Sequence, residues 1–373
     1  MGRRSGTARF ETPLALECGH ELPSFEIAYE TYGTLNAQRS NAILICHGLT
    51  ANQHAAGTVA GKKGWWDVAV GPGKMIDTDR YFVVSPNVLG GGNGSTGPRS
   101  TDPHTGRPYG MRLPMVTIGD MVESQAHLAD VLSIDAFHAV VGGCMGGFQA
   151  LEWMARYPER TRRTIIISAT PRVSTHTIAL WSVMRRAIRS DPNWNGGDYY
   201  AGAAPDAGMG LLATFGALYW MSRDVLAEKY GLRTVADRDL GFSLESEFAV
   251  EAFLDQVACN AQGKFDANTL IYLTRAMDYF DLDRSYGSLT QAFAAVTSPT
   301  LLVSYETDWR YPPAEMNEIA DALRTVGACV RHEVLNSRYG HGAFLCDVSG
   351  LAPVIAEFLA RNEPAPTQIF QST

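Results

Sequence analysis

The chain has 373 residues, of which 46% are hydrophobic and 19% are charged. This composition is typical of a globular protein with a large buried core and argues against a disordered or fibrous chain. The formal net charge of -8 argues against a nucleic-acid or anionic-membrane surface, because both partners require clustered Lys and Arg side chains. We therefore expect a small-molecule substrate, with neither nucleic acid nor membrane as a partner.

The apolar runs of the sequence are short. Residues 42–46 and 164–168 have the length of buried strands and are far too short to span a bilayer. The first ten residues carry basic side chains without the apolar stretch of a secretory signal. Six cysteines are scattered without a C-x-x-C pair, a pattern typical of reduced thiols. These features predict a cytoplasmic protein.

Taken in chain order, the first elements are strands. Residues 26–31 alternate in polarity like a half-buried antiparallel strand, and the continuous apolar run 42–46 begins a buried sheet. Short β-rich segments predict further strands at 81–85, 137–141, 164–168, 300–304 and 328–335. Apolar residues at helical spacing predict helices at 118–132, 147–156, 314–326 and 351–360. This alternation implies an α/β protein with a mostly parallel sheet covered by helices on both faces.

The pattern changes between residues 170 and 295, where strand signals vanish. Helical spacing there predicts helices at 177–189, 210–230, 245–262 and 267–277. Because the strand pattern resumes at residue 300, we expect one core domain built from residues 1–170 and 295–373. Residues 171–294 are then an inserted helical lid.

The strongest chemical signal is the segment G-G-C-M-G-G at 142–147, which lies directly between a predicted strand and a predicted helix. It matches a nucleophile elbow, a strained turn in which nearby glycines leave room for backbone that a Cβ would hit. The nucleophile would be Cys144. A thiol at a helix N-terminus has a lowered pKa, so a reactive thiolate is chemically reasonable.

An elbow requires an acid and then a base later in the chain. Asp308 follows the predicted strand 300–304, and His341 follows the next predicted strand. Because the carboxyl ends of parallel strands meet at one edge of a sheet, both loops are expected beside the elbow. We therefore predict a catalytic triad of Cys144, His341 and Asp308 on an α/β-hydrolase fold.

The oxyanion of an acyl-transfer intermediate needs two backbone N–H donors. We assign them to Met145, the residue after the nucleophile, and to Leu49 in the loop after strand 42–46. The histidines show no spacing typical of metal ligands, and no phosphate-binding glycine loop followed by Lys and Ser or Thr occurs. We expect neither a metal nor a bound cofactor.

At this point the chain resembles the homoserine O-acetyltransferase family, which also includes serine and homoserine O-succinyltransferases and some esterases. The resemblance covers nearly the whole chain and rests on A-Y-E-T-Y-G-T-L-N from Ala28, C-H-G-L-T from Cys46, G-S-T-G-P from Gly94, the stretch 105–120, G-G-C-M-G-G-F-Q-A-L-E-W, D-P-N-W-N-G-G-D-Y-Y and F-D-A-N-T-L-I-Y-L-T-R-A-M-D-Y-F-D.

The resemblance implies an acyltransferase that takes an acyl group from acyl-coenzyme A onto its nucleophile and passes it to the hydroxyl of an amino acid, by a ping-pong route. It also implies that Arg185 binds a substrate carboxylate. Two positions depart from the family: Cys144 replaces the usual Ser, and Gly342 replaces an Asp that holds the substrate ammonium. Acyl-coenzyme A is expected as co-substrate, and a homodimer formed through the lid is expected.

Three functions remain open from the sequence. The leading one is an acyltransferase acting on a small hydroxy or amino acceptor. The second is a carboxylic-ester or thioester hydrolase on the same scaffold, which fold-level likeness does not distinguish from the first. The third is a non-catalytic binding protein that retains the fold.

Overall fold

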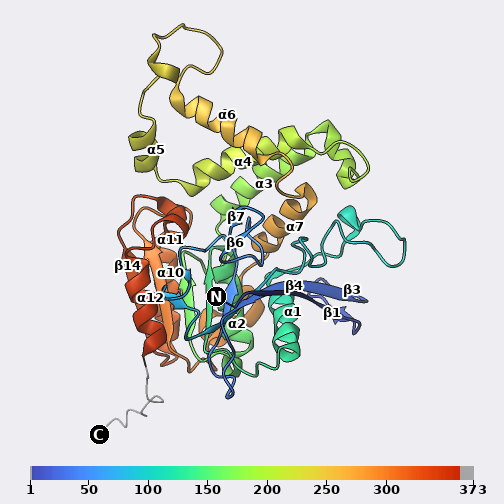
Figure 1. The fold of residues 1–373 in the computed structure, drawn as a ribbon, viewed down its shortest axis with the longest axis vertical. Coiled ribbons are helices and arrows are strands. Elements are labelled where there is room, and N and C mark those ends of the chain that lie inside the picture. Colours follow the sequence, from blue (N-terminus) through green and yellow to red (C-terminus); the bar gives the residue numbers. More distant parts are fainter. Residues whose placement is uncertain (1, 362–373) are drawn as a thin grey trace.

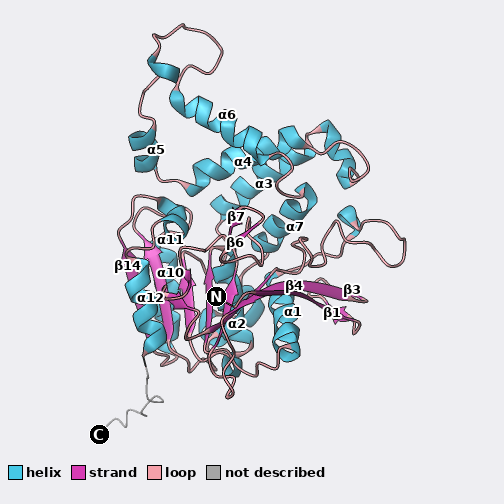
Figure 2. Ribbon diagram, in the orientation of Figure 1, coloured by secondary structure: helices cyan, strands magenta, loops and turns pink. Residues whose placement is uncertain are grey.

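A twisted eight-stranded sheet forms the centre of the molecule (Figures 1 and 2). The computed structural model describes residues 2–361. Across the sheet, the strands follow the order β1 (Arg4–Phe10), β4 (Phe25–Tyr32), β10 (Phe82–Pro86), β5 (Ala42–Cys46), β11 (Ala139–Gly143), β12 (Thr164–Ile167), β13 (Thr300–Tyr305) and β14 (Val330–Leu335). From β10 to β14 each neighbouring pair is parallel, while β4 is antiparallel to both β1 and β10. This is the predicted α/β-hydrolase architecture.

The central strands are buried along their whole length because helices cover both faces of the sheet. Every residue of β5, β11 and β12 is buried, and these strands consist of aliphatic and small side chains. The helices of this layer are α1 (Ile118–Val131), α2 (Met145–Arg156), α10 (Pro313–Thr325), α11 (Ala343–Cys346) and α12 (Leu351–Ala360). Short 3-10 turns lie at Gly110–Arg112, Pro158–Arg160 and Gly340–Gly342.

Small strand pairs extend the loops of the sheet, the first two of them antiparallel hairpins and the third a parallel pair. They pair β2 (Leu14–Ala15) with β3 (Glu21–Leu22), β6 (Thr58–Val59) with β7 (Lys62–Lys63), and β8 (Val70–Gly71) with β9 (Ile76–Asp77). Within residues 2–361 no single helix is long and apolar enough to cross a membrane, although the bent pair of segments 340–346 and 351–360 together reaches that length and composition.

All the helices between β12 and β13 belong to one inserted stretch of chain. They are α3 (Thr175–Arg189), α4 (Asp206–Trp220), α5 (Arg223–Lys229), α6 (Ala249–Ala261), α7 (Ala267–Asp278), α8 (Leu282–Tyr286) and α9 (Leu289–Ala292), with 3-10 turns at Pro192–Gly197 and Val235–Asp237. Helices α3 to α6 stand beyond one end of the sheet and project away from it (Figure 1). Helix α7 packs back on the core, where the Tyr272 hydroxyl donates to the Leu113 carbonyl at 2.6 Å.

One predicted helix is two helices in the structure. The stretch 210–230 breaks between α4 and α5, where Ser222 caps α5 by accepting a hydrogen bond from the Val225 N–H. The Ser222 hydroxyl also donates to the Arg338 carbonyl, and Trp309 donates from Nε1 to the Met221 carbonyl at 3.2 Å. These two hydrogen bonds at the break connect the helical insertion to the loops that follow β13 and β14.

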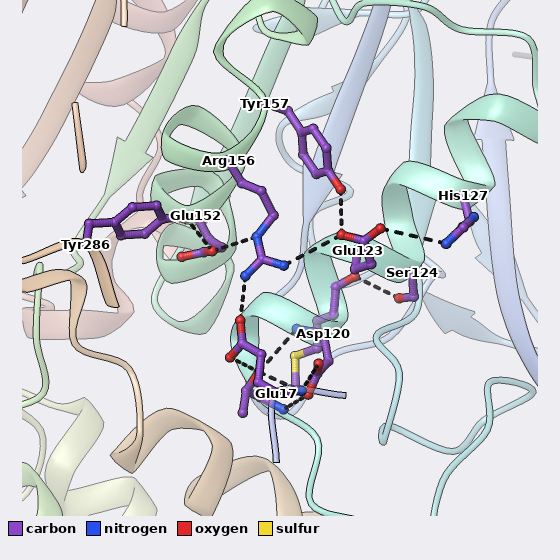
Figure 3. A network of polar contacts seen from close by, with 11 residues as sticks. Glu17, Asp120, Glu123, Ser124, His127, Glu152, Arg156, Tyr157 and Tyr286 are labelled. Carbon is purple, nitrogen blue, oxygen red and sulfur yellow. Dashed lines mark hydrogen bonds and ion pairs between the residues drawn. The ribbon is translucent and has the colours of Figure 1, made fainter. Parts of the chain in front are cut away.

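A polar network at the C-terminal end of α2 joins this helix to neighbouring segments (Figure 3). Arg156 at the end of α2 pairs with Glu152 at 3.0 Å, with Glu123 of α1 at 3.6 Å, and with Glu17 of the β2–β3 hairpin. Tyr286 of α8 donates to Glu152 at 2.8 Å. Arg156 and Glu152 thus connect α2 to α1, to the β2–β3 hairpin and, through the Tyr286 hydroxyl, to α8.

Candidate functional site

The turn between β11 and α2 has the geometry of a nucleophile elbow. Cys144 has φ 58° and ψ -126°, a conformation that L-residues rarely adopt and that is found where surrounding structure enforces it. A Cβ on Gly142 would overlap the Gly146 carbonyl, and a Cβ on Gly146 would overlap the Cys46 carbonyl. The Cys144 N–H is fixed by a 3.1 Å hydrogen bond to the Ile167 carbonyl of β12. The glycines therefore permit the strained turn that presents the thiol.

Two loops from neighbouring strands bring an acid and a base to this turn. Asp308 follows β13, and His341 lies in the Gly340–Gly342 turn after β14. His341 donates from Nδ1 to Asp308 Oδ2 at 2.9 Å, and Asp308 Oδ1 accepts the N–H groups of Arg310 and Tyr311 at 3.0 and 3.1 Å. Both side chains are almost fully buried. These bonds fix the imidazole ring, so that Nε2, which has no hydrogen-bond partner among the described residues, is left for chemistry.

The electrostatics of the site favour a thiolate–imidazolium pair. Burial alone would raise the pKa of the Cys144 thiol, but the charges of Arg310 and His341 outweigh it and lower that pKa to about 7. Burial would likewise lower the pKa of His341, yet the charges of Asp308 and Cys144 hold it above its ordinary value. For Asp308, His341 and the backbone donors overcome burial and lower the pKa.

Cys144 and His341 open into a cavity of about 530 Å³ between the sheet and the helical insertion. Its walls are mostly apolar and come from the loop after β5, from α3, α4 and α6, and from the His341 loop. A smaller cavity of about 320 Å³ adjoins it, and the two share six lining residues, among them Leu49, Met209 and Lys264. A reacting group bound in the larger cavity thus contacts mostly apolar surface.

Arg310 is a residue of this cavity that the sequence analysis missed. Its guanidinium lies over the rings of Trp181, Tyr219 and Tyr311, with 4.8, 4.7 and 5.2 Å between the guanidinium carbon and each ring centroid. The side chain is buried, and Nε and Nη2 have no hydrogen-bond partner among the described residues. No ion pair to it is found in the described chain. A buried cation with free donors beside the thiol suits an anionic ligand.

The other predicted residues differ in where they lie. Met145 begins α2, so its N–H has no partner within the helix, and Leu49 lines the cavity. Both positions fit an oxyanion hole, because β5 and β11 end side by side in register. Arg185 does not line the cavity: it is buried in an ion pair with Asp278 at 2.6 Å, which joins α3 to α7.

Three polar residues of neighbouring loops lie outside the larger cavity. Tyr199 and Tyr200 donate hydrogen bonds to Asp266 at 2.6 and 3.2 Å, and the Asn52 side chain accepts the His54 N–H at 2.9 Å. None of the three lines the larger cavity. Across residues 2–361, no group of three or more His, Cys, Asp or Glu side chains is placed to hold a metal ion.

The chain matches known proteins over most of its length. The α/β hydrolase fold family matches residues 41–345. Homoserine O-succinyltransferase of Litchfieldella anticariensis is 46% identical over 360 residues, which are 95% of this chain and 92% of that protein. This chain belongs to the homoserine O-acetyltransferase family.

Two solved structures place this member of the homoserine O-acetyltransferase family among its relatives. Homoserine O-acetyltransferase from Bacillus anthracis has a TM-score of 0.90 at 29% identity and covers 98% of this chain and 99% of its own. The esterase E22 has a TM-score of 0.87 at 30% identity, with 96% and 100% coverage. By its curated relatives this family member is an acyltransferase, while the likeness to an esterase keeps hydrolysis as a competing reaction.

Proposed function

We propose that the protein transfers an acyl group from acyl-coenzyme A to the hydroxyl of a small acceptor through a thioester on Cys144. The observation that carries the proposal is one cavity in which a thiol of lowered pKa, a buried His–Asp pair and an arginine with unpartnered N–H groups meet. The relatives that carry acyltransferase names support the same reaction class. No cofactor is required for it, and acyl-coenzyme A is a co-substrate.

In the first half-reaction the Cys144 thiolate attacks the thioester carbonyl of the donor. The N–H groups of Met145 and Leu49 stabilise the negative charge that develops on the carbonyl oxygen. As the intermediate collapses, the carbon–sulfur bond to coenzyme A breaks and His341 gives its Nε2 proton to the departing thiolate. Asp308 holds the ring and stabilises its charged form.

In the second half-reaction His341, now neutral, takes the proton of the acceptor hydroxyl. The alkoxide attacks the acyl-cysteine, the bond to Sγ breaks, and the ester product leaves behind a thiolate beside a protonated His341. The two halves share one site, which gives ping-pong kinetics. Residues 171–294 act in this proposal as a lid that excludes water, because α3 and α4 supply the cavity walls opposite Cys144.

Arg310 selects the acyl group in this proposal. A donor whose acyl chain ends in a carboxylate, as succinyl does, would satisfy the free guanidinium donors that no described residue satisfies. The succinyltransferase name of the relative at 46% identity favours this choice of donor. We therefore assign binding of the donor's carboxylate to Arg310. Arg185, which the family resemblance assigned to a substrate carboxylate, pairs through Nη2 with Asp278 and does not line the larger cavity.

The test compares succinyl- and acetyl-coenzyme A as donors in wild type and in Arg310→Met. Release of coenzyme A is followed by chromatography, and the ratio of the two kcat/KM values cancels any general effect on the thiolate. That ratio should fall about 10–150-fold in the variant, as expected for one lost charge-assisted interaction. An unchanged ratio would remove Arg310 from acyl selection.

Hydrolysis is the second candidate function, favoured by the structural likeness to esterase E22. The discriminating measurement is the decay of the isolated acyl-enzyme in buffer alone and with added acceptors. Transfer predicts that an acceptor accelerates the decay and appears as acylated product. Decay in buffer at the full steady-state rate, with no acylated product from any acceptor, would establish the hydrolase.

We further propose that the protein is a homodimer formed through the helical insertion. Leu211, Phe215 and Leu218 occupy one face of α4 at helical spacing and are 54%, 37% and 37% exposed. A contiguous exposed apolar stripe on a helix marks a contact surface. A second copy is the simplest partner, because α4 would then bury the same face in both chains.

A further inference from the structure

A buried chain of side-chain hydrogen bonds ends at the nucleophile elbow and at the loop after β5. Trp153 of α2 donates from Nε1 to Gln125 Oε1 of α1 at 2.7 Å, and Gln125 donates from Nε2 to Gln149 Oε1 at 2.7 Å. Gln149 donates from Nε2 to the carbonyls of His47 and Met145, each at 3.2 Å. The side chains of Trp153, Gln125 and Gln149 are at most 1% exposed.

The two ends of this chain fix its direction. The indole N–H of Trp153 can only donate and the two backbone carbonyls can only accept, so each glutamine amide has one orientation. In that orientation both hydrogens of the Gln149 amide are used, one on each carbonyl. Neither glutamine has a buried polar atom without a partner in residues 2–361. A fully satisfied buried network of this kind holds its members in one arrangement.

The two carbonyls belong to the segments that supply the expected oxyanion donors. The Met145 carbonyl is one peptide unit after the Met145 N–H, and the His47 carbonyl is one peptide unit before the Leu49 N–H. The Gly48 carbonyl, which shares its peptide unit with the Leu49 N–H, lies 2.8 Å from His47 Nδ1. Because a trans peptide points its C=O and N–H in opposite directions, fixing the Gly48 carbonyl also fixes the direction of the Leu49 N–H.

The sheet brings these two segments together but does not extend to the donors themselves. The pairing of β5 with β11 runs as far as Cys46 and Gly142. Beyond that pair the backbones stay in close approach, because a Cβ on Gly146 would lie 2.0 Å from the Cys46 carbonyl oxygen. The Gln149 amide bridges the two segments at this point.

We infer that Gln149 is a positioning residue of the oxyanion hole, whose amide holds the N–H groups of Met145 and Leu49 at the spacing that one carbonyl oxygen requires. Gln149 lines neither cavity, so it acts through the backbone and touches no substrate. The inference rests on the proposed acyl-cysteine, because it concerns the charge that develops when that thioester forms.

The test compares two reactions of the same thiol. Acylation places negative charge on a carbonyl oxygen and requires the oxyanion hole. Alkylation by iodoacetamide displaces iodide from a tetrahedral carbon, places no charge on a carbonyl oxygen and requires only the thiolate. A positioning role therefore predicts a loss of the first rate alone, whereas a general distortion of the elbow would slow both reactions.

Gln149→Met keeps the length of the side chain and removes both donors. The donor is whichever of succinyl- and acetyl-coenzyme A acylates wild type faster, and the single-turnover rate of acylation is followed by mass spectrometry. Acylation should be about 10–100-fold slower in Gln149→Met, while alkylation of Cys144 should stay within about twofold of wild type.

Two further variants control for stability and folding. Glu152→Met places the same side chain three residues further along α2, at a 4% exposed position outside this chain of hydrogen bonds, and should be acylated at the wild-type rate. Gln125→Met leaves Gln149 in place but removes the donor to its Oε1, and should slow acylation by about 3–10-fold. If circular dichroism shows that Gln149→Met does not fold, Gln125→Met carries the test.

The outcomes separate the two proposals. If wild type takes no acyl group on Cys144, the proposed function is wrong and this inference falls with it. If wild type is acylated and the folded glutamine variants are acylated equally fast, only the inference about Gln149 is overturned. An equal loss of acylation and alkylation also overturns it, because the elbow as a whole would then depend on Gln149.

Discussion

A single buried arginine has two opposite effects at this site. Arg310 lowers the pKa of the Cys144 thiol through its charge, and its own unpaired donors are costly to bury. The three aromatic rings around the guanidinium recover part of that cost. Arg310 therefore increases the reactivity of Cys144, while the burial of its unpartnered donors lowers the stability of the fold.

The pH dependence of Cys144 alkylation tests the first effect. The thiolate is the nucleophile, so its alkylation by iodoacetamide should rise with pH around a midpoint near 7. Arg310→Met removes a stabilising positive charge and should move that midpoint upward by about 1–3 units, while Arg310→Lys should move it less. Peptide mass mapping separates Cys144 from the other thiols. Equal midpoints in all three proteins would contradict this role of Arg310.

The stability of the same variant tests the second effect. Arg310→Met replaces a buried cation whose Nε and Nη2 have no hydrogen-bond partner by an apolar chain, so the free energy of unfolding should stay constant or rise by about 1 kcal/mol or more. Urea unfolding measures it. A clear loss of stability would mean that the aromatic rings, rather than a ligand, are the functional partners of the guanidinium.

At the scale of elements, Arg156 contrasts with Arg310, because its guanidinium is paired with carboxylates. Its side chain is 28% exposed and bridges the 5% exposed Glu152 to two further carboxylates. Arg156→Met leaves Glu152 charged and buried without its counter-ion, which should cost on the order of 3 kcal/mol in urea unfolding. The matched control is Arg324→Met, whose partner Asp321 is 71% exposed and whose loss should cost less than about 1 kcal/mol. Similar losses of unfolding free energy in both variants would show that the network in Figure 3 stabilises the fold no more than an exposed ion pair does.

The sequence predicted elements best where one physical signal dominated. The strand 42–46 and the helix 351–360 have their predicted bounds, because each is a compact apolar segment between turn residues. Strand β1 (Arg4–Phe10) was not predicted, since its residues are mostly exposed and it forms only by pairing with β4. The break between α4 and α5 also escaped, because helical spacing continues across it and a tertiary contact to Arg338 accompanies it.

The site shows the same division. Cys144, Asp308 and His341 were predicted because each follows a strand in a fixed order, and the structure brings them together. Arg310 lies two residues beyond Asp308 and carries no local signal of burial; only the packing of Trp181 and Tyr219 against it reveals its place. Long-range packing of this kind cannot be read from spacing. The boundaries of the lid and the cytoplasmic location stay predictions.

At the scale of the whole molecule, the exposed face of α4 predicts the oligomeric state. Phe215→Asp places a charge in the proposed contact and should convert a dimer into monomers in analytical ultracentrifugation. Val131→Asp is the matched control, because Val131 is 58% exposed on α1 and lies outside the helical insertion. A monomeric wild type, or a dimer that persists in Phe215→Asp, would contradict the proposed interface.

The central claim joins distant parts of the chain in one covalent reaction, and intact-protein mass spectrometry tests it most directly. Wild type, Cys144→Ala and His341→Ala are each mixed with succinyl-coenzyme A and quenched in acid. The account predicts one acyl group per chain on wild type, mapped to Cys144, none on Cys144→Ala, and slow labelling of His341→Ala. Labelling that survives in Cys144→Ala, or turnover of that variant at the wild-type rate, would contradict the account.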